Sequence, residues 1–276
     1  MSSATDQARN AALRAERSTS LAWLARAGFI GYGVTHLLVA WLALRIAFGE
    51  PAAETDQSGA LRTLADRPAG RFLVGAIAVG LAAMAVWQVL QAAVGHRGDR
   101  GTERVLERVG SAGRTAFYGY LASLGFRVVA SAGAQPSSAG KQQAASATAM
   151  SDPAGRWAVG MAGVALAAGG VGLAVYGLVR RFEKHLETAR MGPTARRTAR
   201  WLGVTGYLAK GVAYGIAGVL LTVAAVTYSP SKARGLDAAL RTLAAEPYGR
   251  LLLVVVAFGI AAFGVFCFVQ ARYRRV

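Results

Sequence analysis

Long apolar segments alternate with shorter polar, arginine-rich segments along the whole chain. Six apolar segments are long enough to cross the ~30 Å hydrocarbon core of a bilayer as helices. They span residues 28–48, 72–94, 115–134, 157–179, 202–227 and 251–271. The third gives the weakest signal, because it contains Arg127 and several small residues. Since a helix satisfies its own backbone hydrogen bonds in lipid, the pattern predicts an all-α integral membrane protein with six transmembrane helices.

The composition agrees with membrane spans. Of the 276 residues, 54% are hydrophobic and only 16% are charged, whereas a soluble domain has about 25% charged residues. The net charge of +17 would indicate nucleic-acid binding in a soluble protein. Here the basic residues lie between the apolar segments, where they orient the protein and contact anionic headgroups. We therefore expect anionic membrane lipids as partners, and no nucleic acid.

The distribution of basic residues predicts the orientation in the membrane. The N-terminal 27 residues, the second and fourth loops and the C-terminal tail are rich in arginine. The first loop also carries acidic residues, namely Glu50, Glu54, Asp56 and Asp66. By the positive-inside rule, we expect a multi-pass plasma-membrane protein with both termini in the cytoplasm. Residues 1–22 are expected to form a surface helix or to be disordered, and not to be a cleaved signal peptide.

An internal repeat divides the chain into three copies of a two-helix unit, at residues 23–95, 105–180 and 200–273. The second helix of each copy opens with the pattern Pro-x-Gly-Arg. These residues are Pro68, Gly70 and Arg71, then Pro153, Gly155 and Arg156, then Pro247, Gly249 and Arg250. Proline is tolerated in a first helical turn, and the arginine can reach headgroup phosphate.

The first helices of the copies also align, at Gly28, Gly110 and Gly206. Four residues later stand Tyr32, Arg114 and Lys210, and eight residues later stand His36, Tyr118 and Tyr214. Each copy has an even number of spans, so the copies are parallel and are expected to surround a pseudo-threefold axis. Copies one and three share a short amphipathic helix between their spans. In copy two this region is the Ser/Ala/Gln-rich stretch 135–151, which is expected to be flexible.

These repeated features resemble the family called domain of unknown function 1206, over roughly residues 23–273. The resemblance implies paired transmembrane helices repeated three times, in membrane proteins largely of actinobacteria. It implies no activity, because the family has none established. The chain departs from the pattern at Tyr32, where the other copies carry the basic residues Arg114 and Lys210.

Ionisable residues within the predicted spans are cationic or potentially so, and none is Asp or Glu. They are Arg45, Arg127, Lys210, His36 and, at the margin, Arg114. Ion-coupled transporters usually keep carboxylates near the middle of the membrane, so this pattern argues against that mechanism. The counter-charge for the cations must be a lipid phosphate, a bound anion or a loop carboxylate such as Glu54 or Asp152. The alternative is that the long cationic side chains extend to the headgroups.

His36, Tyr118 and Tyr214 predict a polar ring on the inner side of the first helices. His36 has no second histidine in the spans, so we expect neither haem nor a metal. Cys267 is the only cysteine, and no nucleophile, phosphate-loop or dinucleotide motif is present. The sequence therefore predicts a protein that is not an enzyme and needs no cofactor.

The leading hypothesis is a scaffold of the cell envelope that binds anionic lipid headgroups or a small anion. Arg45, Arg127, Arg114 and Lys210 are the candidate binding residues. A channel or uniporter with a path between the repeats is an alternative, motivated by the parallel repeat and the polar ring. A second alternative is a subunit of a larger membrane complex, and a homo-oligomer also remains open.

Overall fold

A computed structural model describes residues 19–50, 54–66, 68–94, 101–130, 138–229, 232–233 and 235–274. The long helices are α2 (Thr19–Ala47), α4 (Pro68–Val94), α5 (Gly101–Ala130), α7 (Pro153–Leu178), α8 (Pro193–Val226) and α10 (Gly249–Tyr273). The shorter elements are α3 (Gln57–Ala65), α6 (Ser138–Ala149), α9 (Gly235–Ala245), and the 3-10 helices η1 (Arg181–His185) and η2 (Thr188–Arg190). The all-helical prediction is confirmed for this part of the chain. Residues 1–18 of the predicted N-terminal segment lie outside it.

Within the described residues, five helices are long and apolar enough to cross a membrane, as the sequence predicted. They cover Ala25–Ala47, Pro68–Ala93, Pro153–Leu178, Pro193–Val226 and Gly249–Tyr273. The predicted third span falls in α5, which carries charged residues along its first half and is described only as far as Ala130. Within the described residues α5 does not meet the same criteria, so the sixth span stays a prediction.

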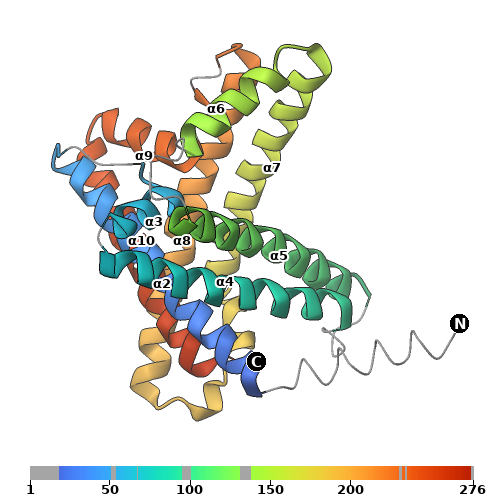
Figure 1. The fold of residues 1–276 in the computed structure, drawn as a ribbon, viewed down its shortest axis with the longest axis vertical. Helices are drawn as coiled ribbons and strands as arrows, with labels where there is room; N and C mark the ends of the chain where they lie inside the picture. Colours follow the sequence, from blue (N-terminus) through green and yellow to red (C-terminus); the bar gives the residue numbers. More distant parts are fainter. Residues whose placement is uncertain are drawn as a thin grey trace, which may run out of the picture.

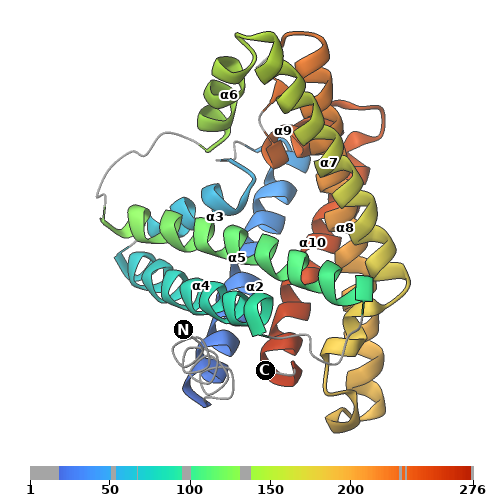
Figure 2. The ribbon, with the colours of Figure 1, turned by 90° about the vertical axis from the view of Figure 1, so that its right-hand side faces the viewer.

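The long helices pack in a chain of neighbours rather than as three equal hairpins. Helices α2 and α4 pack together, and so do α8 and α10, as expected within copies one and three. The two long helices of copy two, α5 and α7, instead pack against α4 and α8 respectively and not against each other. Figures 1 and 2 show α4 and α5 side by side, crossing the direction in which α7 and α8 run. Helix α10 joins the two parts by packing against both α2 and α8.

Glycines allow the backbones of α7 and α8 to approach closely. A Cβ atom on Gly170 of α7 would lie 2.5 Å from the amide nitrogen of Gly215 and 2.6 Å from the carbonyl oxygen of Gly211. Gly163 lies equally close to the α8 backbone. Close packing of small residues is a main source of helix association in lipid. This contact holds α7, whose span is only 11% buried inside the protein.

The Pro-x-Gly-Arg pattern has a structural reason at its glycine. In every copy the space that a Cβ would occupy is taken by the carbonyl oxygen of the residue six positions earlier. These pairs are Gly70 with Leu64, Gly155 with Ala149 and Gly249 with Leu243. The glycine therefore lets the end of the preceding short helix turn tightly onto the start of the next long helix.

The proline and arginine of the pattern differ between copies. Pro68 and Pro153 begin α4 and α7 as expected, but Pro247 lies in the turn before α10, which begins at Gly249. Arg156 donates to the carbonyl oxygens of Ala225 and Val226, at 2.7 and 2.9 Å, and so caps the end of α8. In copies one and three the corresponding arginines, Arg71 and Arg250, are exposed.

A short helix precedes the second long helix in each copy. Helices α3 and α9 confirm the shared amphipathic helices of copies one and three. In copy two, the expectation of a flexible stretch is wrong for Ser138–Ala149, which forms α6. Its alanines, lysine and glutamines favour a helix, and a carboxylate from copy one binds its first turn.

Candidate functional site

The cations predicted near the outer surface have partners close by in the chain. Arg45 donates to the Glu50 carboxylate at 3.0 Å and lies over the Trp41 ring, 5.2 Å from its centroid. Arg127 donates to the backbone oxygen and the hydroxyl of Ser123, at 3.3 and 3.0 Å. Arg45 and Arg127 both stand 17 residues after the aligned glycine of their copies, Gly28 and Gly110, yet each contacts partners in its own copy.

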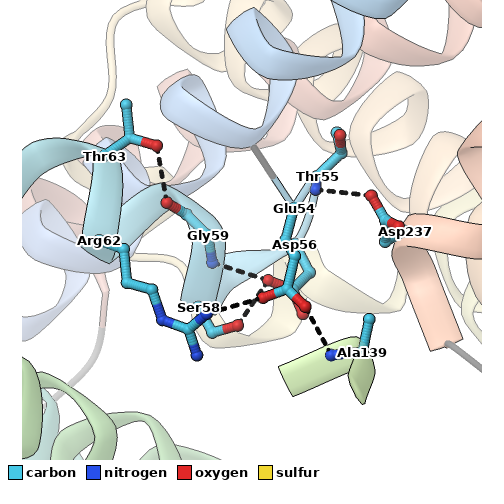
Figure 3. Close-up of polar contacts among 9 residues, drawn as sticks. All are labelled: Glu54, Thr55, Asp56, Ser58, Gly59, Arg62, Thr63, Ala139 and Asp237. Atoms are coloured by element: carbon cyan, nitrogen blue, oxygen red, sulfur yellow. Dashed lines mark hydrogen bonds and ion pairs between the residues drawn. The ribbon is translucent and has the colours of Figure 1, made fainter. Parts of the chain in front are cut away.

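Apart from Glu50, which pairs with Arg45, carboxylates of the outer loops join the copies rather than pair with the span cations. Glu54 accepts from Arg62 at 3.0 Å and from the backbone amide of Ala139 in α6 at 2.7 Å (Figure 3). The buried Asp237 of α9 accepts from the backbone amide of Thr55 at 2.9 Å. Copy one thus binds both of the other copies through this loop. Asp152, the other suggested counter-charge, caps the first turn of α7.

Arg114 lies in a separate ionic network near the predicted cytoplasmic side. It donates to the Gln88 side chain at 3.2 Å and lies 4.0 Å from the Glu107 carboxylate. Glu107 also pairs with Lys184 at 2.6 Å. Burial alone would raise the pKa of Glu107, but the hydrogen bond and charge of Lys184, aided by Arg114, outweigh burial and lower it. Glu107 precedes the predicted span, so searching the spans alone missed this counter-charge.

His185 and Arg274 close this network beside the C-terminal end of α10. The Tyr176 hydroxyl lies 3.3 Å from His185 Nδ1. Burial, followed by the charge of Arg274, lowers the pKa of His185 to about 3. The Arg274 guanidinium lies over the Phe29 ring at 5.0 Å and donates to the Gln270 side chain at 2.6 Å. Arg274 is therefore packed against α2 through Phe29 and held to α10 through Gln270.

Lys210 is buried among aromatic rings, contrary to the alternative that it reaches the headgroups. Its ammonium donates to the Tyr32 hydroxyl at 3.0 Å and lies 3.9 Å from the centroid of the Phe263 ring. The predicted polar ring gathers around this pair. His36 and Tyr118 contact the Tyr32 ring edge to face, at 4.3 and 5.4 Å between centroids. The remaining member, Tyr214, has its ring 5.8 Å from the Lys210 ammonium.

A basic groove lies where α7, η2 and the start of α8 meet. Its volume is about 690 Å³. The lining residues combine four arginines with apolar and aromatic side chains: Arg180, Thr188, Met191, Pro193, Arg196, Arg197, Arg200, Trp201 and Val204. Arg180, Arg196 and Arg197 are exposed, whereas Arg200 pairs with Glu183 at 2.9 Å. We refer to this feature as the α8 groove.

The sequence analysis did not predict the α8 groove as a site. Its arginines lie in or next to the fourth loop, where they were interpreted as signals of membrane orientation. The sequence did carry a signal, since Arg196, Arg197 and Arg200 stand next to Trp201 at the start of an apolar segment. Arginine and tryptophan at a membrane boundary are typical of headgroup contact. That these residues lie close to Arg180 could not be predicted from the sequence, because it depends on how the chain turns back between α7 and α8.

A sequence model of the family described as Domain of Unknown Function (DUF1206) matches the chain three times, over residues 27–95, 109–180 and 205–274. The chain belongs to this family. The three DUF1206 matches confirm the predicted resemblance and its three tandem repeats. The chain is also similar to "Uncharacterized protein YxxB" of Bacillus subtilis (strain 168), with 30% identity over 258 residues that cover 92% of each protein. No solved structure matches the chain.

Proposed function

We propose that this DUF1206 protein is a six-span plasma-membrane protein that binds anionic phospholipid headgroups in the α8 groove. It acts as an envelope-associated scaffold and not as an enzyme, with both termini cytoplasmic. The observation that carries the proposal is the convergence of four arginines and an exposed tryptophan on one groove at the end of two apolar helices.

The lining of the α8 groove suits both parts of a phospholipid. Arginine binds phosphate oxygens through two parallel hydrogen bonds, and Arg180, Arg196 and Arg197 are exposed to do so. Pro193 opens α8, so the positive dipole end of this helix also favours an anion. Met191 and Val204 supply apolar surface beneath the arginines for the glycerol and acyl region.

The expected orientation supports the same ligand. The α8 groove lies in the fourth loop, which the basic residues assign to the cytoplasm. The cytoplasmic leaflet carries the anionic lipids, and each arginine near its surface contributes about 1 kcal/mol to binding. Trp201, with 65% of its surface exposed, is placed to lie at the interface between headgroups and hydrocarbon.

The earlier candidates have lesser parts in this proposal. Arg45 and Arg127 serve as anchors at the opposite membrane surface, and Arg114 stabilises the cytoplasmic network. A central channel has less support, because the buried rings of Tyr32 and Phe263, from α2 and α10, pack edge to face against each other. The exposed apolar face of α7 suits lipid and a membrane partner equally, so it does not favour a complex.

Lipid binding can be measured with the full-length protein in mild detergent, using fluorescent phosphatidylglycerol against phosphatidylcholine. The double variant R196Q/R197Q removes two exposed charges, and the matched control R71Q/R250Q removes two exposed charges near the other ends of the spans. We expect the first variant to bind phosphatidylglycerol about 30-fold more weakly, from about 1 kcal/mol per arginine. We expect the control to bind it like the wild type.

Equal affinity in the wild type and R196Q/R197Q would refute the proposal. So would equal binding of phosphatidylglycerol and phosphatidylcholine by the wild type. Competition by inorganic phosphate at millimolar concentration would identify the groove as a site for free phosphate rather than for a lipid headgroup.

A further inference from the structure

The buried ammonium of Lys210 is surrounded by neutral groups in the part of the chain that the structure describes. Among the described residues no carboxylate pairs with it, and its neighbours are the Tyr32 hydroxyl and the rings of Tyr32, Phe263 and Tyr214. The ring faces attract the ammonium, and the Tyr32 hydroxyl accepts a hydrogen bond from it, but none of these groups carries a negative charge. Cations within membrane spans usually pair with a charged or polar partner. A counter-ion is therefore the missing part of this arrangement.

His36 supplies a second group without a partner at the same place. Its Nδ1 lies 2.8 Å from the backbone oxygen of Tyr32, and a carbonyl oxygen only accepts, so Nδ1 carries a proton and donates it. The other ring nitrogen, Nε2, is fully buried and has no hydrogen-bond partner in the described part of the protein. The whole residue is only 2% exposed. Buried polar atoms are nearly always paired, so Nε2 indicates an additional ligand.

A small cavity lies between these two groups. Its volume is about 10 Å³, which is close to the minimum that holds one water molecule. The polar residues lining it are His36, Gln57, Lys210 and Tyr214, and its other walls are apolar. The Gln57 amide donates to the Tyr214 hydroxyl at 3.4 Å, so the hydroxyl hydrogen of Tyr214 can point into the cavity. Lys210 and Tyr214 thus both offer hydrogen-bond donors to an occupant.

We propose that this cavity binds one monatomic anion, of the size of fluoride, between Lys210 and His36. The ammonium supplies the counter-charge, and the Tyr214 hydroxyl donates a hydrogen bond. His36 takes up a proton at Nε2 together with the anion, because only a protonated Nε2 can donate to it. Phosphate and sulfate are excluded by size. This site is separate from the α8 groove, so either can exist without the other.

The coupling to a proton follows from the groups that face His36. Tyr32 lies on its own helix, Lys210 and Tyr214 face it from α8, Gln57 comes from α3, and Phe263 faces it from α10. Lys210 is the charged member of this set. Two cations side by side repel each other, and an anion between them removes that repulsion. Anion affinity should therefore rise up to tenfold for each unit that the pH falls, since one proton is bound with each anion.

The test uses the full-length protein in detergent, melted in sodium gluconate with increasing chloride or fluoride at constant ionic strength, from pH 8 to pH 5. We expect fluoride to raise the melting temperature more than the larger chloride, with higher affinity at lower pH. K210M should lose the response, and R250M, which removes an exposed cation, should keep it. H36Q should bind the halide through its amide but lose the pH dependence.

Identical melting of the wild type in gluconate, chloride and fluoride at every pH would overturn the proposal, and would mean that the cavity holds only water. An equal halide response in the wild type and K210M would overturn it as well, because the effect would then be one of general salt. If K210M does not fold, H36Q provides the test. A halide affinity in H36Q that depends on pH as in the wild type would contradict proton-coupled binding.

Discussion

Substituting Gly170 tests whether close backbone contact holds α7 in place. An alanine Cβ there would lie 2.5 Å from the Gly215 nitrogen, whereas carbon atoms in contact lie about 3.5 Å or more from their neighbours. Helix α8 would have to retreat by up to about 1 Å. The neighbouring Gly169 is an ideal control, because a Cβ at that position meets no atom of the described chain within 4 Å.

The two substitutions share their effect on helix propensity and differ only in packing. Glycine to alanine in a helix interior gains about 1 kcal/mol, which applies equally to G169A and G170A. Overpacking costs about 1–3 kcal/mol and applies only to G170A. The difference between the variants is therefore about 1–3 kcal/mol. At about 2–4 °C per kcal/mol for a chain of this size, G170A should melt about 2–12 °C below G169A.

The assay is thermal unfolding of both variants in the same detergent, followed by intrinsic tryptophan fluorescence. Trp157 reports directly, because it lies on α7 and is exposed. A G170A protein that melts at or above the temperature of G169A would refute the reasoning. In that case α7 would be held by lipid or by other contacts rather than by its glycine-mediated packing on α8.

Two further predictions concern buried polar groups. His185 has a pKa lowered to about 3 by burial and by Arg274, whereas an unfolded histidine titrates near 6.5. As the pH falls from 6.5 towards 3, the unfolded chain binds a proton at His185 that the folded protein does not bind. The contribution of His185 to the free energy of unfolding is therefore fully present above pH 6.5, and below that pH the free energy of unfolding falls by up to ~1.4 kcal/mol per pH unit. Melting from pH 8 to pH 4 should show this slope in the wild type and a smaller one in H185Q. Asp237 is 1% exposed and binds the Thr55 amide, so D237A should cost ~1–3 kcal/mol and D237N less, and equal melting of D237A and wild type would contradict this.

The sequence was sufficient for the repeat and for most of the helices. Pro-x-Gly-Arg occurs three times at the same point of the unit, and apolar segments of membrane length are an unambiguous signal. The sequence was not sufficient to predict how the two long helices of copy two pack. Helices α5 and α7 do not pack together because each packs against another helix. Helix α5 packs against α4, and α7 packs against α8 through its glycines. That choice depends on the fit of two surfaces, which no pattern within a single segment reveals.

The site around Lys210 was predicted only in part, because it also depends on contacts between different helices. His36, Tyr118 and Lys210 were found by comparing equivalent positions of the repeat, and they do gather around Tyr32. The expectation that Lys210 reaches the headgroups came from its position along the helix alone. Its burial depends on Phe263, which comes from another helix and stacks over the ammonium.

The difference among Tyr32, Arg114 and Lys210 has an electrostatic explanation. These residues stand at one position of the three copies, and three cations facing a common interior would repel one another strongly at low dielectric. Arg114 is balanced by the Glu107 carboxylate and the Gln88 side chain. Lys210 instead donates to the Tyr32 hydroxyl, so the tyrosine supplies an acceptor where a third basic residue would add charge. The break in the repeat at Tyr32 is thus what allows Lys210 to remain buried, and it leaves one positive charge facing the cavity beside His36.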